Sequence, residues 1–362
     1  MSWTPQNCVN NVSTGFLGTD KNVFHAFVAN STNQLVRSGG TDSKWYNLNK
    51  MVDPLNVGVI PVGVAADAFA VYCFVRGCTY GHLALTTLGS DGTVPNPPGV
   101  LFDLGRPNND VTKKVIGPVG TAVLGPFVYC FVNVDDGHLW ANWRSVCNPA
   151  SPISSPSVWS WTDLGVPSGV TVVNGIGATA CGQQLLVYIQ GSDGNLWVNM
   201  WQNNTWLWVN LNQTPHAPTV IGPVGVFTNG IYNSAYIQGS DNHLWLNVTA
   251  NGITSWTDLG VPKTGVTLAR GVGVVPFLFQ IWAFVIGSDG HLWVNWSQTG
   301  ATSWVDLGVP ATGVTVVGSV GAICPTGTPY AFVGGSDGQL WACSYLSATN
   351  TWHWIPLGQP TA

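Results

Sequence analysis

A short motif recurs along the chain, and it constrains the fold more than any other feature of the sequence. Its fullest form is Gly-Ser-Asp-Gly-x-Leu-Trp, where x is a variable residue. Seven copies of differing completeness lie at residues 33–36, 81–84, 135–140, 191–197, 239–245, 287–293 and 335–341. Such repetition predicts one supersecondary unit stacked several times, in which each unit buries the apolar face of its neighbour.

The spacing of the copies gives the size of the unit. Successive motif leucines are separated by 48, 56, 57, 48, 48 and 48 residues. A second motif, Trp-x-Asp-Leu-Gly, follows the first, and its best copies lie at residues 161–165, 256–260 and 304–308. Looser versions follow the other copies of the first motif, so each motif occurs seven times. The chain therefore consists of seven units of 48 residues or slightly more.

Each unit divides into four short strands. In the copy at residues 266–308 we predict strands at 266–275, 281–286, 292–296 and 303–307. The pair Asp289-Gly290 predicts a tight hairpin turn with positive φ at both positions. Four strands per repeat of this length are typical of a propeller blade. We therefore expect an all-β, seven-bladed β-propeller with four antiparallel strands per blade, forming a single domain over residues 1–362.

The low charge content narrows the possible functions. Only 7% of the residues are charged, against about 25% in a typical soluble protein. The 11 Lys and Arg residues and the net charge of −5 provide no basic surface for nucleic acid. No apolar run reaches the roughly 18 residues that insertion into a membrane requires. The N-terminus lacks a signal-peptide pattern, so we expect synthesis in the cytoplasm and release by a signal-free route.

Few residues remain for catalysis or metal binding. All 16 acidic residues are Asp, and most lie in the two motifs, where a turn or a strand corner explains them. Four of the seven His share the slot before the motif leucine, and none shows the spacing of metal ligands. The eight Cys show no paired framework, so we expect free thiols. We therefore expect no enzyme activity, no catalytic residue, no metal and no cofactor.

Two other functions remain open alternatives. A glycosidase, such as a sialidase-like propeller enzyme, needs facing carboxylates, and a sialidase also needs clustered arginines to hold a carboxylate ligand. A protein-binding propeller scaffold would be expected to carry charged, long side chains on its loops. The absence of Glu and the small number of charged residues count against both.

Tryptophan and asparagine recur together on the third predicted strand. The pattern Leu-Trp-x-Asn occurs in four units, and residues i and i+2 of a strand point to the same face. An indole beside an amide suits a sugar ring, because the apolar C–H face can stack on the indole while hydroxyls bond to the amide. The alternative is that these aromatic side chains only hold one blade against the next.

The sequence of residues 287–296, with the Trp-x-Asp-Leu-Gly-Val-Pro run and the repeat length, resembles the Photorhabdus-type bacterial lectins. The resemblance covers essentially the whole chain. It implies a seven-bladed propeller that binds L-fucose and related, including O-methylated, neutral sugars at several sites between blades. It further implies a calcium-independent homo-oligomer that recognises fucosylated or O-methylated host glycans and agglutinates red cells.

Carried onto this chain, the resemblance implies sugar-binding residues on the third and fourth strands of the units. These are Trp140, Asn142, Trp161, Trp197, Asn199, Trp208, Trp245, Asn247, Trp256, Trp293, Asn295, Trp296, Trp304, Trp341 and Trp354. Three departures reduce the number of sites. Cys343 stands where four other units have Asn, and Val36 and Ala84 replace the motif Trp in the first two units. We therefore expect four or five working sites.

Overall fold

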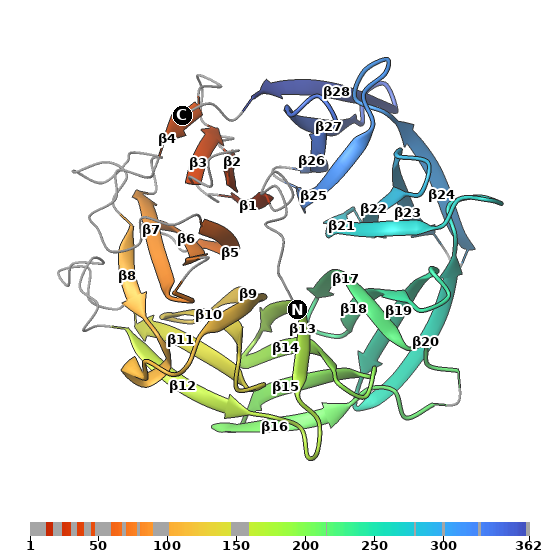
Figure 1. Ribbon diagram of the computed structural model, residues 1–362. Coiled ribbons are helices and arrows are strands. Elements are labelled where there is room, and N and C mark those ends of the chain that lie inside the picture. Colours follow the sequence, from red (N-terminus) through yellow and green to blue (C-terminus); the bar gives the residue numbers. More distant parts are fainter. Residues whose placement is uncertain are drawn as a thin grey trace.

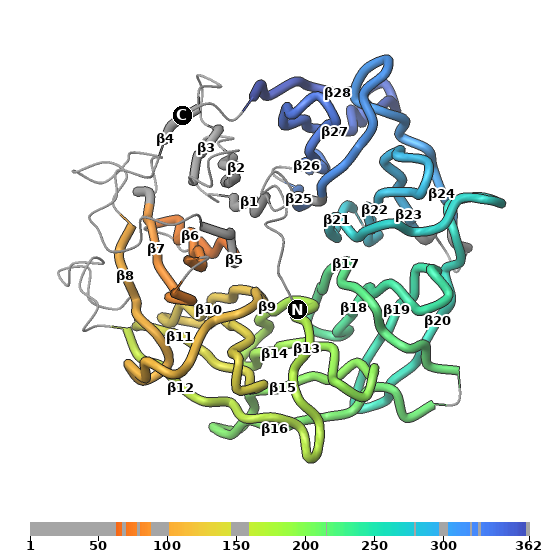
Figure 2. Tube along the Cα trace, in the orientation of Figure 1, coloured from red at the N-terminus to blue at the C-terminus, as the bar shows by residue number. Residues whose placement is uncertain are grey.

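The structure is a computed structural model that forms a ring of small sheets around a central axis (Figure 1). It describes residues 12–16, 24–29, 35–39, 45–47, 59–66, 70–77, 80–89, 101–145, 159–214, 216–278, 280–298, 301–324 and 327–359. The same ring can be followed along the Cα trace in Figure 2. No helix in these ranges is long and apolar enough to cross a membrane.

The described strands form seven four-stranded antiparallel sheets, each from four consecutive strands. Blades one and two consist of β1 (Val12–Phe16), β2 (Phe24–Ala29), β3 (Leu35–Gly39), β4 (Trp45–Asn47), β5 (Val59–Ala66), β6 (Ala70–Gly77), β7 (Leu83–Gly89) and β8 (Phe102–Gly105). Blades three and four consist of β9 (Val115–Leu124), β10 (Phe127–Val134), β11 (Leu139–Ser145), β12 (Ser160–Gly165), β13 (Val172–Cys181), β14 (Gln184–Gly191), β15 (Leu196–Gln202) and β16 (Thr205–Asn210).

Blades five to seven continue the pattern. They consist of β17 (Val220–Thr228), β18 (Asn233–Gly239), β19 (Leu244–Ala250), β20 (Ile253–Gly260), β21 (Leu268–Phe277), β22 (Gln280–Gly287), β23 (Leu292–Gln298), β24 (Ala301–Gly308), β25 (Val316–Ile323), β26 (Tyr330–Gly335), β27 (Leu340–Leu346) and β28 (Thr351–Gly358). A short 3-10 turn, η2 (Pro107–Asn109), lies between blades two and three. The prediction of an all-β propeller with four antiparallel strands per blade is confirmed.

The ring closes through its inner strands. The first strand of each blade lies beside the first strands of the neighbouring blades, and β1 contacts both β5 and β25 (Figure 1). Each sheet keeps two edges, one at the axis and one at the outer rim, and the radial arrangement leaves these edges short and protected. The two ends of the ring differ. We call one the turn face, which carries the second-to-third-strand turns and the connections between blades. The other, the hairpin face, carries the first-to-second and third-to-fourth hairpins.

Glycine allows the inner strands to approach one another closely. A Cβ at Gly271 of β21 would lie 2.2 Å from the carbonyl oxygen of Pro223 and 2.5 Å from the Cα of Val224, both on β17. Gly175 of β13 meets β9 in the same way, with the Pro118 carbonyl oxygen at 2.3 Å. These backbone atoms cannot rotate away, so the small residue is a requirement of the ring.

The turn of the repeated motif differs from its prediction in one respect. In blade six, β22 ends at Gly287 and β23 begins at Leu292, so four residues connect the strands. Gly290 has a positive φ of 76°, whereas Asp289 is not among the residues with positive φ. The prediction of positive φ at both positions is therefore wrong, because this longer turn needs only one left-handed residue.

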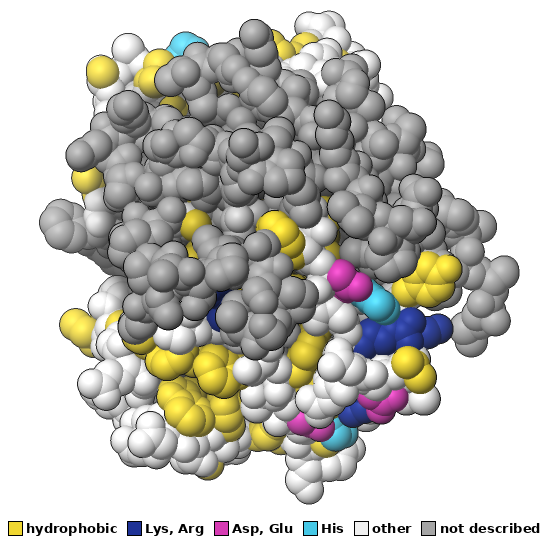
Figure 3. Space-filling view, turned by 90° about the vertical axis from the view of Figure 1, so that its left-hand side faces the viewer, with side chains coloured by type: hydrophobic (Ala, Val, Ile, Leu, Met, Phe, Trp, Pro, Cys, Tyr) yellow, Lys and Arg dark blue, Asp and Glu magenta, His cyan; other side chains and the backbone are white. Residues whose placement is uncertain are grey.

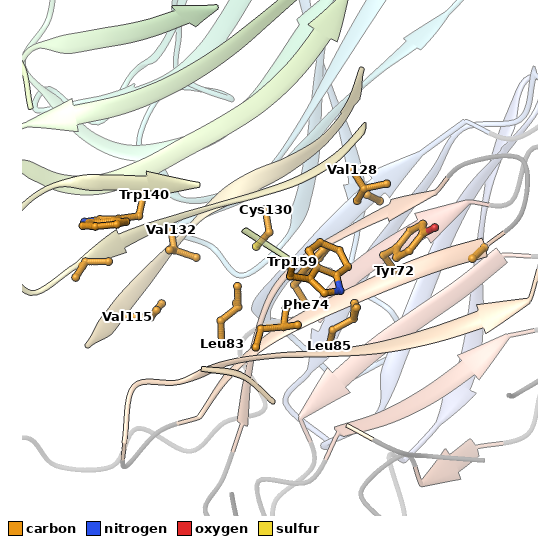
Figure 4. Packing of buried hydrophobic residues seen from close by; sticks show 14 residues of the cluster. Tyr72, Phe74, Leu83, Leu85, Val115, Val128, Cys130, Val132, Trp140 and Trp159 are labelled. Carbon is orange, nitrogen blue, oxygen red and sulfur yellow. The ribbon is translucent and has the colours of Figure 1, made fainter. Parts of the chain in front are cut away.

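Apolar side chains between blades form the cores, as the close view in Figure 4 shows for blades two and three. Phe74 of β6 meets Trp159, which precedes β12, edge to face, with ring centroids 5.5 Å apart and ring planes at 85°. Arg144 lies on the same indole, its guanidinium 5.7 Å from the ring centroid. Such contacts lie between sheets, so each blade depends on its neighbours for burial.

The described cysteines are free, as the sequence predicts for them. Cys73, Cys130 and Cys343 are buried, whereas Cys181 and Cys324 are partly exposed. Burial raises the pKa of the Cys73 thiol well above its ordinary value, so it remains protonated and behaves as a small apolar side chain. The other three cysteines of the sequence, Cys8, Cys78 and Cys147, lie outside the described residues.

Replacing Gly271 with Ala should destabilise the ring, because the added methyl group overlaps backbone atoms of the preceding blade. We expect a loss of about 1–3 kcal/mol in the free energy of unfolding, measured by urea denaturation. The matched control is Gly117→Ala on the inner strand β9, where the nearest atom, the Asn133 Cβ, would be 3.7 Å away. Equal losses in the two variants would contradict the packing argument.

Candidate functional site

The third-strand tryptophans are tied to the turn that precedes them. In blades three to seven the indole N–H donates a hydrogen bond to the turn aspartate four residues earlier, with N–O distances of 3.1 to 3.3 Å. The tryptophans are Trp140, Trp197, Trp245, Trp293 and Trp341. In blade six Asp289 also accepts the backbone N–H of His291. The aspartate therefore forms the turn, as predicted, and also fixes the indole.

Lysine covers two of these indoles. The Lys113 ammonium lies 4.2 Å from the ring centroid of Trp140, and the Lys263 ammonium lies 5.2 Å from that of Trp293. Trp140 and Trp293 are buried, whereas Trp197 and Trp245 are partly exposed. Of these four tryptophans, the last two are therefore the more accessible to a ligand.

The fourth-strand tryptophans connect neighbouring blades. Each indole N–H donates to the backbone carbonyl of a leucine in the preceding blade, at 2.8 to 3.2 Å. The pairs are Trp161 with Leu104, Trp208 with Leu164, Trp256 with Leu211, Trp304 with Leu259, and Trp354 with Leu307. In four of the pairs, the leucine belongs to the Asp-Leu-Gly part of the second motif. The two motif residues thus meet across the boundary between consecutive repeats.

The motif asparagines are buried beside these tryptophans. Asn142, Asn199, Asn247 and Asn295 each pair in register with the fourth-strand Trp of their blade, and none is more than 2% exposed. Asn199 donates from Nδ2 to the Leu164 carbonyl, the same acceptor that Trp208 uses. Both amide atoms of Asn142 lack a hydrogen-bond partner. In blade seven, Cys343 occupies this register position opposite Trp354.

The predicted Trp and Asn residues therefore lie side by side in blades three to six, as the strand pattern indicates. Trp296 lies elsewhere, next to Trp282, with ring centroids 5.9 Å apart. The indole N–H groups of the fourth strands are occupied by bonds between blades, which is the structural role that the sequence left as an alternative. Sugar binding by this set stays a prediction.

Histidines of the motif slot pair with the aspartate of the second motif. Nδ1 of His138, His243 and His291 lies 2.9 to 3.1 Å from the carboxylate of Asp163, Asp258 and Asp306, respectively. The same carboxylates accept a backbone N–H from the following glycine at 2.8 Å. Asp241, His243 and Asp258 lie close enough to share a cation, but they are at the surface and are already hydrogen-bonded. Their arrangement is explained by strand corners.

A separate cleft opens between blades three and four at the hairpin face. Its volume is about 1150 Å³. Its walls come from the hairpin ends of β9, β10 and β11 on one side, and from β13 to β16 on the other, with Gly230 and Asn233 of blade five at the rim. The cleft lies at the opposite face from the repeated Gly-Ser-Asp-Gly turns.

Aromatic rings form the walls of this cleft. Tyr129 and Trp143 stack on the blade-three side, with centroids 6.2 Å apart and ring planes at 27°. Trp201 and Trp206, cross-strand neighbours on blade four, have centroids 5.4 Å apart. The Trp143 N–H donates to the Thr162 hydroxyl at 2.9 Å, which fixes the orientation of its ring. These four rings are partly exposed, so part of each is accessible to a ligand.

Side-chain amides surround the rings, and the described residues of the lining include no charged side chain. The amides belong to Gln183, Gln184, Gln202, Asn203, Asn204 and Asn233. Burial raises the pKa of Tyr129, so its phenol is neutral at physiological pH. The cleft therefore offers apolar faces and neutral hydrogen-bonding groups.

Blades six and seven repeat the aromatic positions of this cleft but fill the space. By strand register, Phe277 and Trp282 correspond to Leu124 and Tyr129, and Tyr345 and Trp352 correspond to Trp201 and Trp206. Here Trp282 crosses the gap, and its centroid lies 5.1 Å from that of Tyr345 and 5.4 Å from that of Trp352. Among the described residues, no ring contact joins Tyr129 to Trp201 or Trp206. The smaller Leu124 and Tyr129 explain why the first cleft is open.

The cleft residues were not among those predicted to bind a ligand. Trp143 directly follows the Leu-Trp-x-Asn pattern of blade three. Trp201 follows that of blade four after Met200, and Trp206 is the second residue of β16. The repeat does not predict them, because the residues at the positions of Trp201 and Trp206 differ between blades. Blades four and seven have aromatic residues there, whereas blade five has Thr249 and Thr254. A search for aromatic residues that depart from the consensus of the repeat would have identified the cleft residues.

The asparagine register allows a direct test. Asn199→Thr removes the bond to the Leu164 carbonyl and should lower the free energy of unfolding by about 1 kcal/mol. Asn142→Thr, with the residue that blade two has at this position, Thr86, removes an amide without partners and should cost less. Urea denaturation of both variants provides the comparison, and an equal or larger loss in Asn142→Thr would contradict this assignment of bonds.

Comparison with known proteins supports the fold. No protein-family model matches the chain, and no curated protein sequence matches it. The BP39L lectin from Burkholderia pseudomallei is similar in structure, with a TM-score of 0.65 at 15% identity over 97% of this chain and 99% of that one. An Aleuria aurantia lectin mutant in complex with α-methyl-L-fucoside has a TM-score of 0.51 at 12% identity, covering 98% and 97%.

Propellers of other function are similar as well. A puromycin-hydrolysing peptidase of Mycobacterium tuberculosis has a TM-score of 0.58 at 9% identity, and the match covers 98% of this chain and 54% of the peptidase. At these identities the similarity establishes the β-propeller architecture alone. The function must be argued from the side chains of this chain.

Proposed function

We propose that this protein is a lectin that binds neutral sugars in the cleft between blades three and four. The observation that carries the proposal is the lining of that cleft, in which tryptophan and tyrosine rings stand beside side-chain amides without any charged group. The sugar class we propose is L-fucose and related sugars, including O-methylated ones. The lectins among the similar structures, one of them in complex with a fucoside, support this choice.

The chemistry of a neutral sugar fits these walls. The C–H groups of a pyranose ring form an apolar face that packs on an indole, while its hydroxyls need neutral donors and acceptors. An amide side chain supplies both from one group. A methyl group, as in fucose or an O-methyl ether, would add apolar area against Trp201 and Trp206. The volume of about 1150 Å³ is several times that of a monosaccharide, so the cleft has room for a short oligosaccharide.

Catalysis is disfavoured by the same lining. Glycoside hydrolysis uses two carboxyl groups placed on either side of the scissile bond, and the cleft lining contains no carboxyl group. A protein-binding scaffold is the other alternative, and the hairpin face could serve one. The cleft favours the lectin because its concave, aromatic and amide-rich surface suits a small ligand.

Binding to cells would depend on several weak sites acting together. We propose that the repeated Trp and Asn pairs with partly exposed indoles, at Trp197 and Trp245, provide further sites, and that the chain forms a homo-oligomer. In that form it would agglutinate red cells and recognise host glycans after release from the cell by a signal-free route.

Closing the cleft tests the proposal. Leu124→Phe with Tyr129→Trp introduces the residues that fill the equivalent space in blade six. We expect the binding of methyl α-L-fucoside to weaken at least tenfold, measured by saturation-transfer NMR titration, because the cleft is the strongest site and only the weaker sites at Trp197 and Trp245 remain. We also expect the far-UV spectrum and unfolding midpoint to change little, since blade six shows that the fold accepts both side chains.

The matched control is Phe277→Leu with Trp282→Tyr, the reverse exchange between blades six and seven. It should leave binding at the first cleft at wild-type strength. If the cleft-closing variant keeps wild-type affinity, the cleft is not the sugar site. If the wild-type protein binds no fucoside and no other neutral glycan on an array, the lectin proposal itself fails.

Sugar binding in the cleft should be nearly independent of pH between about 5 and 7.5. The lining has no carboxyl, imidazole or amino group that titrates in this range, and burial raises the pKa of Tyr129 further above it. Affinity titrations at three pH values would check this. A change of more than tenfold would show that the site contains one of the His–Asp pairs of the turn face.

A further inference from the structure

The boundary between blades two and three has an arginine where the boundary between blades three and four has a cleft tryptophan. Arg144 of β11 lies two residues after the motif asparagine of its blade, as Trp201 does on β15. Trp159 lies two residues before the fourth-strand tryptophan of its blade, as Trp206 does. Arg144 and Trp159 therefore occupy the positions that Trp201 and Trp206 occupy in the wall of the cleft.

Aromatic and apolar side chains surround Arg144 and Trp159 at this boundary. The ring of Tyr72 on β6 lies 6.5 Å from the Trp159 ring, with the ring planes at 74°. Figure 4 shows Trp159 among Tyr72, Phe74, Leu85 and Val128, all of which belong to one buried cluster. A charge in such surroundings is costly unless an opposite charge or several hydrogen bonds compensate it.

The guanidinium of Arg144 is nevertheless buried without a partner. The residue is 3% exposed, and its Nε and Nη1 atoms have no hydrogen-bond partner. The guanidinium lies over the Trp159 ring, 5.7 Å from the ring centroid. An arginine does not lose its proton in a protein, so the side chain retains its full charge there.

The described carboxylates of blades two and three lie at the other end of these sheets. Asp163 pairs in register with Trp140, four residues before Arg144 on the same strand, which corresponds to about 13 Å. The other described carboxylates of the two blades lie in turns, corners and connections of the turn face, at Asp103, Asp110, Asp135 and Asp136. In the edge-on view of Figure 3, the acidic side chains likewise lie on the right-hand side, away from the hydrophobic group at the lower left. None of these carboxylates is paired with Arg144.

Two more buried polar side chains at this boundary lack partners. Asn142 lies two residues before Arg144, so both side chains point to the same face of the sheet. Neither amide atom of Asn142 has a hydrogen-bond partner, and the residue is fully buried. The indole N–H of Trp159, a residue only 7% exposed, has none either. Because buried polar groups are almost always hydrogen-bonded, this set of donors suits a ligand that accepts hydrogen bonds.

We propose that the boundary between blades two and three binds the carboxylate group of a ligand, with Arg144 as the anchor and the Trp159 N–H as a second donor. A carboxylate is planar and matches the fork of guanidinium N–H groups. Its single negative charge balances the single positive charge, whereas a doubly charged phosphate would leave one charge uncompensated among apolar side chains. The Asn142 amide can both donate to and accept from the rest of the ligand.

The position of Arg144 makes an acidic sugar the first source of this carboxylate, in a step that rests on the proposed function. Arg144 is the last residue but one of β11, so it lies at the hairpin end of the boundary, level with the sugar cleft. A uronic acid combines the pyranose ring proposed for the cleft with a carboxylate. A free small carboxylate such as acetate is the other source of the same chemistry, and the experiments separate the two.

Thermal unfolding of the full chain in Tris buffer tests for the carboxylate site. Sodium acetate at about 100 mM should raise the melting temperature by at least about 2 °C relative to sodium chloride at the same concentration, because a ligand of the folded state stabilises that state. A larger rise with methyl β-D-glucuronide than with acetate would assign the ligand to the acidic sugars, and a rise with acetate alone to free carboxylates. Equal melting temperatures in acetate, glucuronide and chloride would overturn the proposal.

Arg144→Met separates a binding role from a structural one. Methionine fills similar space without a charge, so without carboxylate the variant should melt at or above the wild-type temperature, because an unpaired buried charge is removed. The variant should also lose the response to acetate and glucuronide. A variant that melts lower, in a protein whose wild type ignores carboxylates, would show that the chain itself compensates Arg144, and the proposal would fail.

Arg270→Met is the matched control, because it removes an exposed arginine of β21 and should respond to acetate as the wild type does. Equal losses of response in Arg144→Met and Arg270→Met would show that acetate acts on surface charge, against the proposal. Trp159→Phe keeps an aromatic ring but removes the N–H, and it should weaken acetate binding about threefold or more in an NMR titration. Binding of methyl α-L-fucoside should stay at wild-type strength in all three variants, so it reports on the lectin proposal alone.

Discussion

The hydrogen bond from a fourth-strand indole to a leucine carbonyl of the preceding blade is the interaction on which the ring depends. A four-stranded sheet cannot bury both of its faces alone, and adjacent blades must therefore meet at a constant distance. The five described bonds of this kind, at 2.8 to 3.2 Å, set that distance near the outer rim. Glycines such as Gly271 set it near the axis.

The two faces of the propeller therefore differ in how much change of sequence they tolerate. At the turn face, the Asp, Trp and Gly residues of each motif contact one another closely; a Cβ at Gly287 would lie 2.5 Å from Asp289 and 2.8 Å from the Trp293 indole nitrogen. Little can change there without loss of the turn. The described part of the hairpin face shows no such repeated contacts, and its side chains differ from blade to blade. The cleft with Tyr129 and Trp206 lies in this variable region.

Repetition explains why part of the candidate site could be predicted and part could not. The pairing of Asn199 with Trp208 follows from the period of two along a strand, and the structure places these residues opposite one another. That Trp208 donates to Leu164, 44 residues earlier in the chain, depends on how blades meet. The cleft residues Trp201 and Trp206 lie outside the consensus, so an argument based on repeats gives them no weight.

The sequence by itself determined the strand content, the repeat length and the low content of charged residues. These properties are local, because turn residues, strand alternation and charge content are read from neighbouring positions. Only the tertiary structure decided which of the equivalent spaces between neighbouring blades remains open as a cleft. Tyr129 and Trp282 occupy equivalent positions, yet one borders a cleft and the other fills it. Whether the space is open or filled depends on the sizes of side chains that face one another from separate blades. These side chains are distant in the sequence, so their packing follows only from the way the blades are placed.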